Sequence, residues 1–294
     1  MPQATHSTIV CSIDDGIAHV EIDRAHKLNS ITREVFEDLV EIGLALKDST
    51  EVKAVVISGR GRAFSAGLDM SEMARIAQTG APTQSSAEAA AESTAATDAG
   101  AGSESSTESV VDLGGRLGAA RALAQKAVHV WSLVEVPVIA GVKGPAFGAG
   151  MQIALGADIR VVGPDAKLSL MEVNWGIIPD MCGTQLLPRL VGPGMAKKLI
   201  FTSEAVDAQA ALRIGLAEEV AEDPIARALE LAAEIAGKSR SALVWAKKLV
   251  DLSYEAELVE GFDAEQQALS ELLGTDEQKQ VVEAGLARLR AAKA

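Results

Sequence analysis

Alternation of apolar and polar residues predicts two strands at the start of the chain, over residues 8–13 and 17–22. The Asp14-Asp15-Gly16 segment between them is typical of a tight hairpin turn. Apolar residues then recur at helical spacing, which predicts an amphipathic helix over residues 33–47. A strand is predicted next over residues 53–58, where residues 54–57 form an apolar run.

A similar order of elements returns later in the chain. An apolar run over residues 138–142 predicts a buried strand, and a glycine-rich loop separates it from a helix that opens over residues 151–155. Two more strands are predicted over residues 159–162 and 167–170. The pattern favours an α/β protein built as a spiral of strand-strand-helix units, although other α/β arrangements fit it too.

Helical spacing dominates the second half of the chain. Before it, a long amphipathic helix is predicted over residues 113–134, ended by Pro137. The later helices are predicted over residues 183–190, 193–201, 207–214, 224–236, 241–252 and 255–273. In the last of them Leu258, Phe262, Leu269 and Leu272 form one apolar stripe, which predicts packing in the core or against a second copy of the chain. We therefore divide the chain into an α/β core over residues 1–200 and a C-terminal helical region over residues 201–294.

One segment departs from these patterns. Residues 78–109 consist almost entirely of Ala, Ser, Thr, Gly and Glu and contain no large apolar residue. Such a segment buries too little surface to offset its ordering entropy, so we expect a mobile insertion. A solvated insertion is the simpler interpretation, and a lid over a substrate is the functional one.

Composition excludes several classes of function. The 294-residue chain is 48% hydrophobic and carries a net charge of −14, which disfavours a nucleic-acid partner. Two scattered cysteines do not make a disulfide framework, and the four histidines share no metal-ligand spacing, so no metal site is expected. The chain shows neither a signal-peptide pattern nor an apolar run long enough for a membrane span. We expect a cytoplasmic protein that is not bound to a membrane.

Two glycine-rich loops of similar design carry the first chemical signal. Each follows an apolar strand and leads into a helix, one over residues 59–70 and the other over residues 143–150. A dinucleotide-binding pattern would need glycine where Ile153 stands, and no phosphate-binding G-K-[ST] follows. Two such loops can offer two backbone N–H donors to one oxygen, as in an oxyanion hole, where each donor is typically worth ~10²–10³ in rate.

Four segments resemble the crotonase family, the enoyl-CoA hydratases and isomerases. They are RAHKLNS at residues 24–30, AFSAGLDM at 63–70, GPAFGAGMQIALGADIR at 144–160 and MEVNWGIIPDMCGTQLLPRLVG at 171–192. The likeness covers almost the whole chain outside the insertion. It implies the spiral fold, an acyl-CoA thioester substrate with no separate cofactor, and assembly into homotrimers or hexamers. It also places the two oxyanion donors on the backbone N–H groups of Ala66 and Ala149.

The resemblance implies binding residues as well. Those implied to contact coenzyme A are Arg24, Lys27, Leu28, Ala63, Ser65, Leu68 and Asp69. Those expected to line the acyl pocket are Met151, Trp175, Met181 and Cys182, and nothing suggests that Cys182 is a nucleophile. Lys247 and Lys248 are candidates for a contact to a coenzyme A phosphate, although solvated helix lysines are more usual.

A thioester that reacts at its α or β carbon needs a base near the oxyanion hole, and a carboxylate in an apolar pocket can supply it. Glu172, at the end of a predicted strand, falls on a catalytic glutamate of the family. At position 152 the hydratases resemble this chain but carry a second glutamate, whereas Gln152 stands here. An amide has no useful basicity, so Gln152 can hold a water or a substrate group but cannot relay a proton.

Asp180 offers a second carboxylate. The dienoyl-CoA isomerases resemble this chain in having aspartate there, but they also carry aspartate where Gln152 stands, so that likeness is partial. Glu172 and Asp180 are expected at opposite ends of one unsaturated chain, where they can move a proton between carbons without water. The alternative for Asp180 is a turn or helix-capping role.

These residues favour an enzyme of fatty-acid or related acyl-CoA metabolism that shifts a double bond through an oxyanion-stabilised enolate. A hydratase that uses Glu172 alone, with Gln152 orienting the water, is the first alternative. A catalytically silent acyl-CoA-binding protein is the second. A thioesterase or C–C lyase of the same family also stays open.

Overall fold

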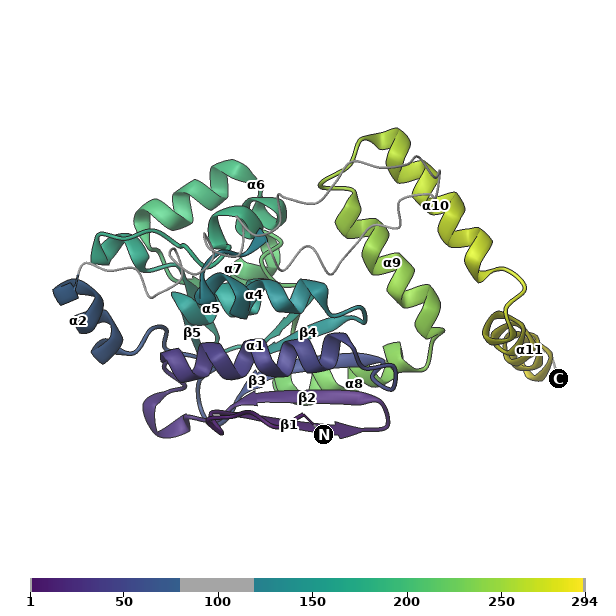
Figure 1. The fold of residues 1–294 in the computed structure, drawn as a ribbon, viewed down its shortest axis with the longest axis horizontal. Helices are drawn as coiled ribbons and strands as arrows, with labels where there is room; N and C mark the ends of the chain where they lie inside the picture. Colours follow the sequence, from purple (N-terminus) through teal and green to yellow (C-terminus); the bar gives the residue numbers. More distant parts are fainter. Residues whose placement is uncertain (1, 80–118, 293–294) are drawn as a thin grey trace, which may run out of the picture.

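The computed structural model describes residues 2–79 and 119–292, which fold around a six-stranded sheet (Figure 1). The strands β1 (Ile9–Asp14), β2 (Ile17–Ile22), β3 (Ala54–Gly59), β4 (Val138–Val142), β6 (Ile159–Val162) and β9 (Glu219–Val220) lie side by side in that order. β1 and β2 form the predicted antiparallel hairpin, and every other neighbouring pair is parallel.

Helices cover both faces of this sheet. Helices α1 (Arg33–Lys47) and α4 (Leu123–Leu133) pack on one face, and α8 (Pro224–Ala236) packs on the other. β3 and β4 are buried along their whole length, because central parallel strands are covered on both sides. In β2 alternate residues are buried, as expected for a strand nearer the edge.

A smaller sheet lies beyond the C-terminal end of β4. It consists of β5 (Pro145–Phe147), β7 (Lys167–Ser169) and β8 (Val206–Asp207), and α5 (Ala149–Leu155) follows β5 directly. β4, β5 and α5 form one strand-strand-helix unit, and β6 and β7 begin the next. After β7 come a short 3-10 helix, η3 (Glu172–Trp175), and α6 (Gly183–Thr202).

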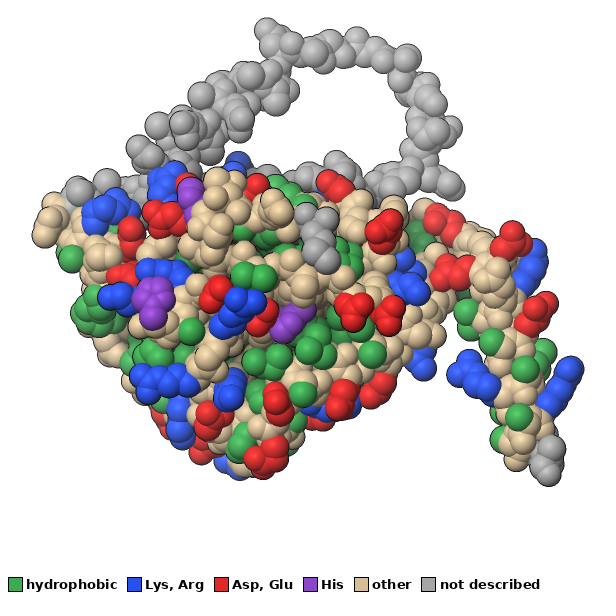
Figure 2. Space-filling model, turned by 90° about the horizontal axis from the view of Figure 1, so that it is seen from below, with side chains coloured by type: hydrophobic (Ala, Val, Ile, Leu, Met, Phe, Trp, Pro, Cys, Tyr) green, Lys and Arg blue, Asp and Glu red, His purple; other side chains and the backbone are tan. Residues whose placement is uncertain are grey.

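Of the remaining helices, α2 (Met70–Thr79) lies at one end of the molecule, after the first glycine loop (Figure 1). A short 3-10 helix, η1 (Ala25–Lys27), follows β2, and α7 (Ala208–Arg213) lies between β8 and β9. At the other end α9 (Arg240–Leu252) packs against the core through Val244, and α10 (Leu258–Leu272) and α11 (Asp276–Ala291) project from the body of the protein (Figures 1 and 2).

Several boundaries differ from the prediction. α4 begins only at Leu123, because residues 120–122 are not helical; the part of the predicted helix before residue 119 lies outside the described residues. The insertion predicted over residues 78–109 also lies outside them from residue 80 onward. α5 begins at Ala149, since residues 145–147 pair with β7 as a strand. The helices predicted over 183–190 and 193–201 form α6, which is broken at Gly192 by a φ of 77°.

The predicted boundary near residue 200 does not separate two packing units. β8 pairs with β7, β9 pairs with β6, and α8 covers the main sheet, so residues up to 236 complete the core. α11 was not predicted, because all of its residues are at least partly exposed and its apolar positions are sparse. None of the described helices has the length and apolarity needed to cross a lipid bilayer.

Candidate active site

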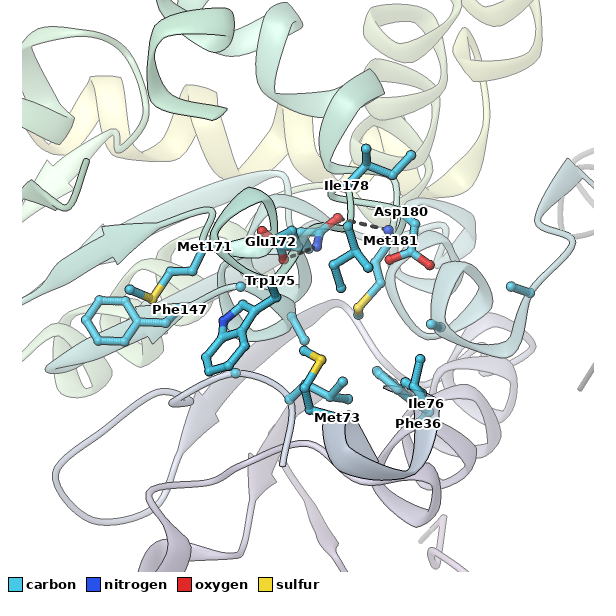
Figure 3. A pocket seen from close by; sticks show the side chains of 18 of the residues that line it. Phe36, Met73, Ile76, Phe147, Met171, Glu172, Trp175, Ile178, Asp180 and Met181 are labelled. Atoms are coloured by element: carbon cyan, nitrogen blue, oxygen red, sulfur yellow. Dashed lines mark hydrogen bonds between the residues drawn. The ribbon is translucent and has the colours of Figure 1, made fainter. Parts of the chain in front are cut away.

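A cavity of about 1080 Å³ opens between α2, the two glycine loops and the segment from η3 to the start of α6 (Figure 3). Its wall is mainly apolar and contains three polar side chains that matter for chemistry, Gln152, Glu172 and Asp180. In the sequence, only the resemblance to the family indicates that these three residues belong to one site. The structure places all of them on one cavity wall.

The two glycine loops are joined by backbone hydrogen bonds. Ser65 N–H donates to Pro145 O at 3.0 Å, and Phe147 N–H donates to Ser65 O at 3.0 Å. Gly67 lies so close to the second loop that a Cβ there would meet Phe147 O at 2.8 Å. The loops therefore need glycine at this crossing, and the crossing fixes the backbone amides that follow it.

The predicted oxyanion donor on Ala66 is wrong for this structure. Ala66 N–H donates to Leu28 O at 2.9 Å, so it is not free to bind a substrate oxygen. Two residues further on, Leu68 N–H makes no hydrogen bond with any described residue, and the same holds for Ala149 N–H. Leu68 and Ala149 both line the cavity. The pair of available donors is therefore Leu68 and Ala149, one from each loop.

Glu172 is the most unusual charged group of the site. It is the first residue of η3 and is only 8% exposed. Its Oε1 accepts a hydrogen bond from Gln152 Nε2 at 2.8 Å, whereas its buried Oε2 has no partner among the described residues. Burial raises the pKa of the carboxyl group, and the nearby charge of Asp180 acts in the same direction. Such a group can accept a proton from carbon.

Gln152, on α5, is buried, and its amide is held at both ends. The carbonyl Oε1 accepts from Met181 N at 2.9 Å and from Gly183 N at 3.1 Å. The amide Nε2 donates to Glu172. Gly183 must be glycine for this contact, because a Cβ there would lie 2.7 Å from the carbonyl oxygen. Gln152 thus connects the Glu172 carboxylate to the start of α6.

Asp180 lies at the exposed edge of the same cavity. Its carboxyl group lies close to its own backbone N–H, and no hydrogen bond or ion pair joins it to the side chain of another described residue. No capping bond to the start of α6 is seen. Desolvation raises the pKa of its carboxyl group. In Figure 3 the labelled Asp180 and Met181 lie on one side of Glu172, and Met171 and Phe147 lie on the other.

The apolar wall agrees in part with the prediction. Trp175 and Met181 line the cavity. Met151 and Cys182 do not, because Met151 is buried in the core and Cys182 Sγ lies against Gln125 O at 3.7 Å. The prediction missed the apolar residues Phe36, Met73, Ile76, Phe147 and Ile178, labelled in Figure 3. The apolar pattern of α2 could have pointed to Met73 and Ile76, which lie three residues apart on one helix face.

The residues assigned to coenzyme A have several roles. Leu68 lines the described wall of the cavity, and Leu28 supplies the carbonyl that holds Ala66. Ala63 and Ser65 are buried, and Ser65 Oγ donates to Asn29 O at 2.7 Å, so these side chains shape the loop from within. Lys27 is exposed and forms no ion pair with the described residues.

The side chains of Arg24 and Asp69 connect the two loops on which they lie. Arg24 donates to Ser30 O and lies 3.5 Å from Asp69 Oδ2. Asp69 also accepts from Ser30 Oγ at 2.8 Å and from Ser71 Oγ at 2.8 Å. These hydrogen bonds lower the pKa of Asp69 to about 2. Both side chains therefore anchor the loops.

The lysines proposed for a phosphate contact are engaged elsewhere. Lys247 pairs with Asp158 at 2.9 Å and donates to Trp131 O at 3.2 Å, and its side chain is only 7% exposed. Lys248 lies 3.8 Å from Glu135 and 5.3 Å from the ring centre of Trp245. Both lysines therefore dock α9 onto the core. Among the described residues no three potential metal ligands converge.

Comparison with known proteins assigns the chain to a family. The family model for enoyl-CoA hydratase/isomerase matches residues 12–97 and 118–290. A short-chain-enoyl-CoA hydratase of Clostridium acetobutylicum is 30% identical over 281 residues, covering 95% of this chain and 94% of the relative. A crotonyl-CoA hydratase of Syntrophomonas wolfei is 27% identical, covering 97% of each protein.

Solved structures agree with this assignment. The crystal structure of an enoyl-CoA hydratase from Bacillus anthracis superposes with a TM-score of 0.77 at 25% identity, covering 96% of this chain and 97% of that one. The predicted fold class, an α/β spiral of the crotonase type, is confirmed. The chain belongs to the enoyl-CoA hydratase/isomerase family.

Proposed function

We propose that the protein shifts the double bond of an enoyl- or dienoyl-CoA through an oxyanion-stabilised enolate. The observation that carries this proposal is the carboxylate pattern of the cavity. Glu172 presents an unpartnered buried oxygen, the Asp180 carboxyl group lies in the same wall without a bond to another side chain, and the neutral Gln152 lies between Glu172 and α6. This pattern suits the movement of a proton between two carbons.

In the proposed reaction the thioester carbonyl oxygen accepts hydrogen bonds from Leu68 N–H and Ala149 N–H. Glu172 Oε2 removes a proton from the α carbon, and the electron pair moves through the conjugated system onto the carbonyl oxygen. The two N–H groups stabilise that charge. A proton then returns at the far end of the conjugated system, at C4 of a 3-enoyl chain or C6 of a 3,5-dienoyl chain. Protonated Asp180 supplies it and later regains the proton that Glu172 took.

The raised pKa values of both carboxyl groups fit these roles. A base that is poorly solvated binds a proton more strongly than one in water, and an acid that keeps its proton nearer to neutral pH can deliver it. The cavity extends to both sides of Glu172, so it can hold the thioester on one side and the acyl chain on the other (Figure 3).

Hydration of a 2-enoyl-CoA is the second candidate. Relatives that cover almost the whole chain are named as hydratases. In that reaction Glu172 would act alone and Gln152 would orient the water. The hydrogen bonds of Gln152 weigh against this role, because its carbonyl oxygen already accepts two backbone N–H groups.

The test is a parallel assay of 3-enoyl-CoA, 3,5-dienoyl-CoA and 2-enoyl-CoA with the purified protein. Isomerisation of either of the first two, faster than hydration of the third, is the expected result. Brisk hydration without isomerisation would overturn the proposal. A silent acyl-CoA-binding protein would turn over none of the three, and its affinity alone would respond to Glu172→Gln.

We also infer that the chain assembles into a homotrimer or a dimer of trimers. The stripe on α10 does not pack in the core, since Leu258 is 71% exposed and Phe262 is 55% exposed. Contiguous exposed apolar residues of this kind favour a protein interface. Light scattering after size exclusion should give three or six times the mass of one chain, and a monomer would contradict the inference.

A further inference from the structure

We propose that Gln152 is a positioning residue that keeps the Glu172 carboxylate ionised and so selects proton abstraction over water addition. The inference rests on the proposed function, in which Glu172 moves a proton of the substrate. It concerns what the chain gains from an amide at a position where the resemblance implies a second glutamate.

The orientation of the Gln152 amide follows from its donors. Met181 N–H and Gly183 N–H can only donate, so the group facing them must be the carbonyl oxygen. The NH₂ group then faces Glu172 Oε1 at 2.8 Å. A flipped amide would set donors against donors at one end and an oxygen against a carboxylate at the other. Gln152 therefore donates to Glu172 in every allowed arrangement.

This donation favours the charged form of Glu172. The charged group that faces Glu172 is Asp180, which lies on the segment before α6 and disfavours a second negative charge. α5 contributes the neutral Gln152, and the backbone N–H groups of Met171 and Glu172 favour the carboxylate. Burial acts against it. Gln152 is thus the side chain that offsets burial and Asp180.

A glutamate at position 152 would reverse this balance. Its first oxygen would receive the same two N–H groups at the beginning of the 20-residue helix α6, where partial positive charge stabilises an anion. Its second oxygen would lie against Glu172 Oε1, and two carboxyl oxygens at that distance must share a proton. The helix terminus favours the anion at position 152, so Glu172 would hold that proton and start the reaction as an acid.

The close packing of Gly183 against Gln152 shows that the contact depends on glycine at this position. A Cβ on Gly183 would lie 2.7 Å from Gln152 Oε1 and 3.0 Å from Gln152 Cγ. The preceding residue, Cys182, has a φ of 67°, which turns both donor amides toward one oxygen. A substitution at Gly183 therefore disturbs the contact without changing Gln152 or Glu172.

Three variants test the proposal. Gln152→Glu reverses the charge balance, and Gly183→Ala pushes the Gln152 amide away from α6. Gln185→Glu is the matched control, because it adds the same charge to the first turn of α6 on an exposed side chain that lies outside the cavity wall.

The first readout needs no turnover. Protein carrying ¹³C-labelled glutamate carboxyl groups is titrated by NMR, and the Glu172 signal is assigned by its loss in Glu172→Gln. We expect this signal in Gln152→Glu to titrate at least about one pH unit higher than in the wild type. Gly183→Ala should shift it in the same direction by less, and Gln185→Glu should leave it in place. An unchanged titration in Gln152→Glu overturns the proposal.

The second readout is the exchange of α protons of a bound acyl-CoA with D₂O, measured against pH. A pKa rise of about one unit lowers the ionised fraction about tenfold, so exchange below the pKa should fall about tenfold in Gln152→Glu. The ratio of 2-enoyl-CoA hydration to isomerisation should rise at least as much, and a constant ratio would also overturn the proposal. If the titration shifts but the wild type exchanges no α proton, the proposed reaction fails while the positioning role stands.

Discussion

Asp69, just before α2, and Glu172, in η3, are two carboxylates with opposite surroundings. Asp69 accepts hydrogen bonds on both oxygens, from Ser30 and Ser71, and lies beside Arg24. Glu172 accepts from Gln152 on one oxygen and has no described partner on the other. The pKa of Asp69 falls to about 2, whereas the pKa of Glu172 rises. Hydrogen-bond donors dominate at Asp69 and lower its pKa, whereas burial dominates at Glu172 and raises its pKa.

The difference separates an anchor from a reactive group. A carboxylate with satisfied oxygens is stabilised as an anion and gains little from taking a proton. A buried carboxylate with one oxygen unpaired is poorly stabilised, which is the state expected of a base. Both residues fall in segments that resemble the family, which implies a catalytic role for Glu172 and a coenzyme A contact for Asp69, but the sequence does not show how either carboxylate is paired.

Removing each carboxylate should have unequal effects on turnover. Glu172→Gln keeps the shape of the side chain but removes the base, so kcat should fall by roughly 10²–10⁴-fold. Asp69→Asn is the matched substitution, and we expect it to lower kcat by less than about tenfold, because Asp69 acts on loop structure. Steady-state kinetics with the preferred acyl-CoA gives both values. Equal losses in the two variants would remove the distinction.

Asp180 provides the next largest effect. Asp180→Asn removes the proposed proton donor, and we expect isomerisation to slow by about 10–100-fold. In the proposed reaction Asp180 must be protonated, so its ionisation stops turnover at high pH. The amide of Asp180→Asn cannot ionise, so the fall of kcat/KM at high pH should disappear from what activity is left. A full rate with an unchanged pH profile would support a purely structural role for Asp180.

The sequence predicted the elements that carry the site and missed contacts made by the backbone. β2, β3, β4 and β6 carry clear apolar patterns, and the sequence motifs point to Glu172, Gln152 and Asp180. The oxyanion donor was misplaced from Leu68 to Ala66, because side-chain letters do not show which N–H group already bonds to Leu28. Backbone hydrogen bonds across loops depend on the folded path, which no local pattern encodes.

The same limit applied to binding residues. Asp69 and Arg24 lie in family-like segments and Lys247 lies on α9, and each is engaged by a partner far away in the sequence. The apolar residues of α1 and α2 that line the cavity were missed for the opposite reason. An apolar helix face predicts burial, and a cavity wall and a core look alike in sequence.

The melting temperatures of Asp69→Asn and Glu172→Gln, each compared with the wild type, should differ in opposite directions at neutral pH. The folded pKa of Asp69 lies below its usual 3.8, so its contribution is present above about pH 4 and is lost as the pH falls toward 2. Asp69→Asn should therefore lower the melting temperature at pH 7, with a difference that shrinks in acid. Thermal unfolding followed by circular dichroism between pH 3 and 8 measures it, and a difference independent of pH would contradict the assignment.

For Glu172 the sign is reversed. Its folded pKa is raised, so its favourable contribution is complete below its usual 4.5 and is lost as the pH rises through the folded value. Glu172→Gln should therefore raise the melting temperature at neutral pH while abolishing turnover, and the gain should vanish in acid. A lower melting temperature at pH 7 would show that the carboxylate stabilises the fold.

Cys182 gives the smallest expected effect, because burial makes it unreactive although it is next to the site. Its pKa rises from 9.0 to about 11 through desolvation and the nearby charge of Asp180. The thiolate is the reactive form, so its fraction at neutral pH is about 100-fold below that of an ordinary thiol. Alkylation of the folded protein at pH 7.5 should therefore be slow, with turnover retained, and Cys182→Ala should keep most activity. Denatured protein, in which the thiol is solvated, is the control and should react fast. Rapid alkylation of Cys182 with parallel loss of turnover would mean that the thiol reaches the cavity. Cys182 would then have to be counted among the reactive groups of the site, together with Glu172.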